Sequence, residues 1–107
     1  MDFQTLIERA RTIRAKYAAL EKAQYGREWT GEELMLGYMK DIGDLAKLVQ
    51  AKEGVRPTEN VNEELAHELS DCLWSVIVLA DKYDVDLETA FAKTMNGLET
   101  RLSQNGK

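Results

Sequence analysis

Two pairs of acidic residues in this chain share the spacing acid-x-x-acid: Asp41 with Asp44, and Glu68 with Asp71. Both pairs stand in helix-forming sequence, and residues three apart on an α-helix lie about 60° apart around its axis. Each pair therefore projects to one side of its helix. The 23 residues between Asp44 and Glu68 are enough for a helix end, a loop and a returning helix. Two such helices packed antiparallel would bring four carboxylates to one place.

Four neighbouring carboxylates repel one another and raise each other's pKa unless a cation compensates their charge. A hard divalent cation prefers oxygen ligands, so Mg²⁺ is the first choice and Mn²⁺ a substitute for it. The pattern therefore predicts a metal site with all four acids as ligands. The alternative is that the acids lie at the edge of the core and pair with Lys40, Lys47 or Lys82.

Four helices are predicted to position these acids, from the recurrence of apolar residues and from end signals. They run from about 2 to 25, from 31 to about 52, from 61 to about 83 and from 87 to about 103. Thr30 with Glu33, and Asn60 with Glu63, are candidate capping boxes, and Asp86 is expected to cap the last helix. With one proline in 107 residues, the whole chain (1–107) is expected to be a single all-α domain resembling a four-helix bundle.

The predicted third helix is apolar nearly all round between residues 69 and 80. Trp74 and Val78 lie opposite a face that carries Leu65 and Leu69. Because a helix that is apolar on every side must be buried on every side, this pattern predicts a homo-oligomer. The alternative is a central helix that its own neighbours in the chain cover.

The overall composition excludes several classes of protein. The 19 acidic and 14 basic residues give a net charge of −5, which argues against sequence-independent binding of nucleic acid. A single cysteine, Cys72, excludes an internal disulfide and fits a reducing compartment. The first residues show no signal-peptide pattern, and the longest apolar stretch, 72–80, is too short to span a bilayer. A cytoplasmic protein without a membrane or nucleic-acid partner is expected.

Several stretches of the chain resemble one family. Residues 29–34 (WTGEEL) with 41–46 (DIGDLA) resemble the first motif of the MazG-like nucleotide pyrophosphohydrolases, in the all-α NTP pyrophosphatase superfamily. Residues 64–74 (ELAHELSDCLW) resemble the second motif, and 83–91 (YDVDLETAF) the link into the last helix. The resemblance covers about 29–101. It implies a helical dimer or tetramer that hydrolyses nucleoside triphosphates, often deoxy ones, to the monophosphate and pyrophosphate, with a house-cleaning role in the nucleotide pool.

The resemblance also implies roles for individual residues. The four acids become Mg²⁺ ligands, and Lys93, Asn96 and, as a weaker match, Arg101 contact the phosphates. Glu64, one helical turn before Glu68, is a candidate for orienting the attacking water. Trp29 is either a packing residue or an aromatic surface on which the base stacks.

The first acidic pair departs from the family pattern. The family has glutamate at both positions, whereas this chain has Asp41 and Asp44, preceded by Lys40. A shorter acid requires the metal to approach its helix more closely or to be reached through water. Two other readings therefore stay open: a non-catalytic module that binds metal or nucleotide with an eroded first motif, and a helical interaction protein whose acids are solvated.

Overall fold

The structure is a computed structural model that describes residues 1–105. These residues form four helices: α1 (Phe3–Tyr25), α2 (Gly31–Lys52), α3 (Val61–Lys82) and α4 (Leu87–Asn105). The prediction of an all-α fold with four helices is confirmed, and each boundary falls within two residues of the expected one. In residues 1–105, none of the helices combines the length and the apolar character that crossing a membrane requires.

Local side-chain contacts explain where most helices begin. The hydroxyl of Thr30 accepts a hydrogen bond from the backbone N–H of Glu33, whose carboxylate accepts one from the N–H of Thr30, so the predicted capping box of α2 is confirmed. Asp86 caps α4 by accepting from the N–H of Thr89 at 3.2 Å, as expected. At the far end of α1, Gly26 adopts φ 80°, a left-handed conformation that favours glycine.

The predicted capping box of α3 is wrong. Asn60 precedes α3 in a left-handed conformation, with φ 57° and ψ 28°, and its side chain makes no capping hydrogen bond. An N-cap residue needs an extended backbone for its side chain to reach the N–H three residues on. The turn that leads into α3 denies Asn60 that backbone, so the sequence match with Glu63 has no structural counterpart.

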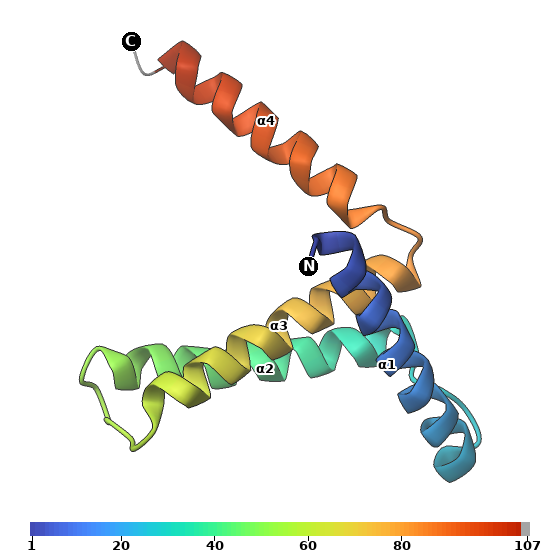
Figure 1. Cartoon of the computed structure of the whole chain (residues 1–107). Helices are drawn as coiled ribbons and strands as arrows, with labels where there is room; N and C mark the ends of the chain where they lie inside the picture. Colours follow the sequence, from blue (N-terminus) through green and yellow to red (C-terminus); the bar gives the residue numbers. More distant parts are fainter. Residues whose placement is uncertain (106–107) are drawn as a thin grey trace.

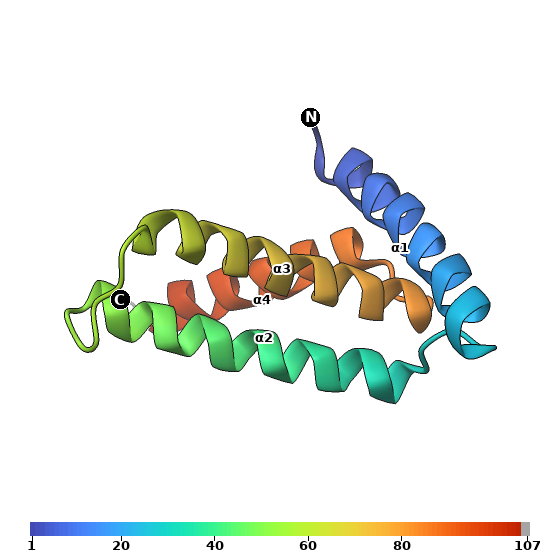
Figure 2. The ribbon, with the colours of Figure 1, turned by 90° about the horizontal axis from the view of Figure 1, so that it is seen from below.

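Helices α2 and α3 run antiparallel beside each other, and α1 crosses α3 near its C-terminal half (Figure 1 and Figure 2). The contact between α1 and α3 holds a buried cluster of Ile7, Ala10 and Ile77, with Trp74 packed against it. Figure 1 shows α4 leading away from the other helices, with its C-terminal end far from α2 and α3.

The apolar faces of α3 are covered unequally. Val78 is only 5% exposed and Trp74 packs on the cluster shared with α1, so this face is covered within the chain, as the alternative reading of α3 held. By contrast, Leu69 and Leu73 are 52% and 47% exposed. The apolar surface left open on α3 is therefore the one around Leu69 and Leu73, and not the face of Trp74 and Val78.

Candidate active site

Three acids from two helices meet where α2 and α3 lie side by side. Asp41 and Asp44 come from α2 and Glu68 from α3, and one carboxylate oxygen of each lies within 4.8 Å of the other two. All three side chains are half-buried. The acid-x-x-acid spacing places both aspartates on the side of α2 that faces α3, and the antiparallel pairing brings Glu68 opposite them. Three of the four predicted ligands are thus assembled around one point.

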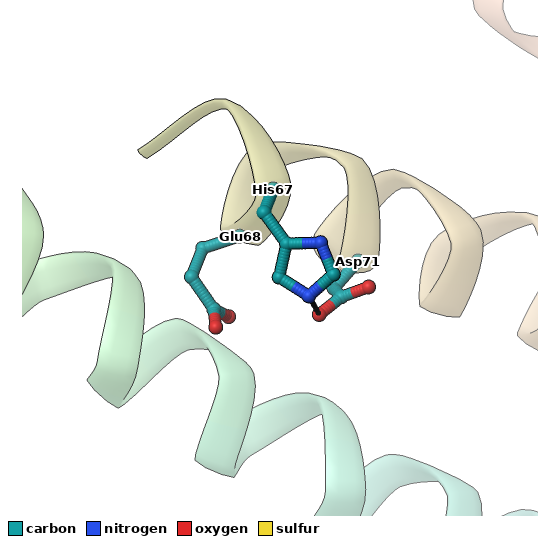
Figure 3. A group of neighbouring side chains, drawn as sticks. All are labelled: His67, Glu68 and Asp71. Atoms are coloured by element: carbon teal, nitrogen blue, oxygen red, sulfur yellow. Dashed lines mark ion pairs between the residues drawn. The ribbon is translucent and has the colours of Figure 1, made fainter. Parts of the chain in front are cut away.

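The fourth acid, Asp71, belongs to an adjoining group. Its carboxylate, the carboxylate of Glu68 and a ring nitrogen of His67 lie within 4.8 Å of one another. His67 Nε2 is 3.2 Å from Asp71 Oδ2, and Figure 3 shows this contact while the Glu68 carboxylate extends toward α2. His67 is exposed, and its contact with Asp71 is a feature that sequence reasoning missed. Glu68 is the residue that the two groups share.

The environment of Glu68 disfavours its negative charge. Burial is the main cause that raises the pKa of Glu68, and the charges of Asp71, Asp44 and Asp41 add to it. In residues 1–105, its Oε2 atom is buried and has no hydrogen-bond partner. An unpartnered buried acceptor beside like charges is costly unless a cation compensates it. This oxygen-only donor set fits Mg²⁺.

One protein cation already reaches this group. Lys40 Nζ lies 3.0 Å from Asp44 Oδ2, one turn apart on α2. The hydrogen bond to Asp44 is the main cause that raises the pKa of Lys40, and the charges of Asp41 and Glu68 contribute. The lysine-paired alternative is thus realised at Asp44. The ammonium group takes up part of the acceptor capacity of Asp44 and would compete with a metal for this carboxylate.

Residues 30–104 match the MazG nucleotide pyrophosphohydrolase domain. The chain belongs to this family. The chain is also 34% identical over 70 residues to the Gene 37 protein of Mycobacterium phage L5, an alignment that covers 62% of this chain and 60% of that protein. No solved structure matches the chain.

Two cavities flank the acids of this MazG domain. The first, of about 420 Å³, has aromatic walls and reaches Asp41; its aromatic lining residues are Tyr17, Trp29 and Trp74. The second, of about 440 Å³, lies on the other side of the acids and is lined by Asp44, Glu64 and Glu68. We call them the aromatic cavity and the α2–α3 loop cavity. Glu64, the candidate for orienting water, therefore faces the same space as Glu68, and Trp29 the same space as Asp41.

Trp29 is held by a buried ion pair that sequence reasoning missed. Glu21, only 6% exposed, accepts hydrogen bonds from the two terminal guanidinium nitrogens of Arg14 at 2.8 and 2.7 Å. The same carboxylate accepts the backbone N–H of Trp29 at 2.8 Å. The Trp29 ring also stacks on Tyr25, with centroids 5.1 Å apart. Nothing in the sequence separates this pair from the other charges of α1, because its burial depends on the chain returning at residue 29.

The predicted phosphate contacts on α4 do not reach the acids within one chain. Lys93, Asn96 and Arg101 are all exposed and lie on the helix that leads away from α2 and α3 (Figure 1). In the described part of the chain, no residue of α4 lines either cavity beside the acids. The roles assigned to these three residues stay predictions, and they require the α4 of a second copy or a different placement of α4.

Proposed function

We propose that this MazG-family protein is an Mg²⁺-dependent hydrolase that converts ribo- or deoxyribonucleoside triphosphates to the monophosphate and pyrophosphate. The observation that supports this most directly is the meeting of three carboxylate oxygens from two helices within 4.8 Å, with a buried oxygen of Glu68 left without a hydrogen-bond partner. A house-cleaning role in the cytoplasm, as a homodimer or homotetramer, accords with this activity.

The acids and the two cavities suggest how the reaction is arranged. A divalent cation held by Asp41, Asp44, Glu68 and Asp71 would neutralise phosphate charge and lower the pKa of a neighbouring water. A carboxylate of this site orients a water for attack on the α-phosphorus, and Glu64 is the residue predicted for this role. The new bond joins the water oxygen to the α-phosphorus. The bond that breaks joins the α-phosphorus to the oxygen that bridges the α- and β-phosphates. Pyrophosphate leaves with that oxygen, and the water's proton passes to the carboxylate that orients the water and then to solvent.

The aromatic cavity supplies a place for the nucleoside. It begins at Asp41 and carries Trp29, whose backbone Glu21 fixes. Base stacking on an aromatic ring contributes about 1–3 kcal/mol and tolerates different bases. Lys93, Asn96 and Arg101 would add phosphate contacts if a second copy brings its α4 to this site.

The test is a panel of ribo- and deoxyribonucleoside triphosphates incubated with the protein and Mg²⁺. Monophosphate plus pyrophosphate is the expected product pair, and Glu68→Gln should abolish its formation. Diphosphate plus phosphate, or an activity that survives in Glu68→Gln, would contradict the proposal.

A second candidate is a module that binds metal or nucleotide without hydrolysing it. The observation that favours it is the 3.0 Å contact between Lys40 and Asp44, through which an internal cation occupies one of the carboxylates. In this reading the shorter acids and the lysine stabilise the helix pair in place of a metal. The same panel would then give binding without turnover.

A further inference from the structure

The α2–α3 loop cavity combines acidic and basic side chains. Beside the acids it is lined by Lys47 from α2, and by Arg56 and Thr58 from the loop between α2 and α3. These three residues supply ammonium, guanidinium and hydroxyl donors. Phosphate oxygens accept hydrogen bonds from all three groups. The donors are thus placed along the same space as Asp44 and Glu68, on the side away from Trp29.

The two cations of this cavity are not committed elsewhere. In residues 1–105, neither Lys47 nor Arg56 forms an ion pair within 4.0 Å, although other surface cations such as Arg11 and Arg27 do. Arg56 also has a positive φ of 54° immediately before Pro57, a backbone conformation that a non-glycine residue adopts at a cost. Arg56 is exposed, and it lines the cavity without a competing ion pair in the described residues.

We infer that this cavity binds the pyrophosphate half of the substrate, with Lys47 and Arg56 as its cationic contacts and Thr58 as a neutral donor. The inference rests on the proposed function and adds to it the direction in which the substrate lies across the acids, which we call its polarity. The nucleoside lies in the aromatic cavity, the α-phosphate lies at the acids, and the β- and γ-phosphates extend toward the loop. Because the attacking and leaving oxygens lie in line, the water then approaches from the Asp41 side, and Glu64 adjoins the leaving pyrophosphate in place of its predicted role. Lys47 and Arg56 then stabilise the negative charge that grows on the leaving pyrophosphate.

This polarity predicts that the two products use different cavities. The monophosphate should depend on the aromatic cavity, and pyrophosphate on Lys47 and Arg56. Substitution at the loop cavity should therefore separate the two affinities, whereas a general change in surface charge would alter both together. The separation is measurable without turnover.

The experiment measures binding of inorganic pyrophosphate, and separately of a nucleoside monophosphate, to the full chain by calorimetry with Mg²⁺ present. The variants are Lys47→Ala and Arg56→Ala, with Lys47→Arg as the conservative exchange. Lys52→Ala is the matched control, because Lys52 lies on the same helix but its Nζ bonds Asn62 Oδ1 at 2.6 Å, outside the cavity. Each alanine variant should weaken pyrophosphate binding about tenfold or more, as expected for loss of a charged contact, and leave monophosphate binding within about twofold. Lys47→Arg should retain most of the pyrophosphate affinity.

Several outcomes overturn the inference while leaving the proposed function standing. If the native protein hydrolyses triphosphates but both alanine variants bind pyrophosphate normally, the loop cavity is not its site. If a variant lost affinity for pyrophosphate and for the monophosphate equally, or if Lys52→Ala lost as much pyrophosphate affinity as the cavity variants, the effect would be one of general surface charge. If the native protein hydrolyses no triphosphate, the proposed function fails separately, and selective loss of pyrophosphate binding in the variants would still support the site. If the native protein does not bind pyrophosphate, the inferred pyrophosphate site is overturned.

Discussion

At the scale of single residues, Asp41 and Asp44 separate an enzyme from a binding module. If they are working ligands, changing either one to asparagine should lower kcat/KM at least a hundredfold, because the metal is weakened and the attacking water misplaced. Restoring the longer acids with Asp41→Glu and Asp44→Glu should then be neutral or harmful. A sharp gain of pyrophosphohydrolase activity in that double variant would instead identify the native protein as the binding module. Lys40→Ala is the control that removes the contact to Asp44 and keeps both acids.

Glu68 gives a second prediction at this scale, on stability. A ligand that binds only the folded protein stabilises it by about 2.7 kcal/mol at a hundredfold excess over Kd, which raises the Tm of a domain of this size by about 10 °C. Mg²⁺ or Mn²⁺ should produce this rise in the native protein but not in Glu68→Gln. Without metal, Glu68→Gln should melt at the same temperature or higher, because it removes the two causes that raise the pKa of Glu68: the burial of its charge and the repulsion from the neighbouring acids. If millimolar metal leaves the melting curve of the native protein unchanged, the predicted metal site is ruled out.

At the scale of helices, the Glu21 carboxylate joins the end of α1 to the start of α2. Hydrogen bonds from Arg14 are the main cause that lowers the pKa of Glu21 below its usual 4.5, against the opposing effect of burial. A group whose pKa is lower in the folded state stabilises the protein above its unfolded pKa, and this stabilisation is lost as the pH falls through the folded pKa. Stability should therefore decline below about pH 4.5. Glu33 adds to this loss of stability at lower pH, because Arg27 lowers the pKa of Glu33 to about 2.

The corresponding variant is Glu21→Gln. It should lose about 2 kcal/mol of stability at pH 7, because a largely buried charged pair is broken, and its stability should fall less steeply on acidification. Chemical denaturation between pH 7 and pH 3 measures both effects. Glu8→Gln is the matched control on α1, because Glu8 is exposed and forms no ion pair in the described chain. Parallel pH profiles for Glu21→Gln and the native protein would contradict this account.

The helices also show how far sequence reasoning extends. The α2 capping box could be predicted because Thr30 and Glu33 lie within one turn and depend only on the local chain. The meeting of Asp41 with Glu68 could be predicted because helical spacing and one antiparallel pairing fix it. The capping box predicted at Asn60 is wrong because the turn before α3 holds the Asn60 backbone in a left-handed conformation. The places of Lys47 and Arg56 could not be predicted, because they depend on how the loop folds back against α2.

At the scale of the whole molecule, one chain is unusually extended. Its radius of gyration is 17.2 Å, whereas a compact domain of this length has about 13 Å. Four apolar side chains at helical spacing on α4 are exposed: Phe91, Met95, Leu98 and Leu102. Together with the exposed Leu69 and Leu73 of α3, they leave apolar surface that a second copy could cover. The predicted oligomer is consistent with this shape.

Two sets of substitutions test the assembly. Leu69→Glu with Leu73→Glu should dissociate the oligomer in sedimentation experiments while circular dichroism still shows helices, because both residues are about half exposed in one chain. Val78→Asp should instead unfold the chain, because it places a carboxylate in a buried position at a cost of several kcal/mol. A native protein that sediments as a stable monomer at micromolar concentration would exclude the assembly altogether.

The aromatic cavity has an optical consequence. The chain contains two tryptophans, Trp29 and Trp74, and both line this cavity next to Asp41. A nucleoside bound there would change the fluorescence of the unlabelled protein, whereas pyrophosphate on the far side of the acids would leave it nearly unchanged. Fluorescence titration of Trp29→Phe and Trp74→Phe would show which indole reports the base. Equal quenching by pyrophosphate and by a nucleoside monophosphate would mean that the emission does not distinguish the two sides of the acids.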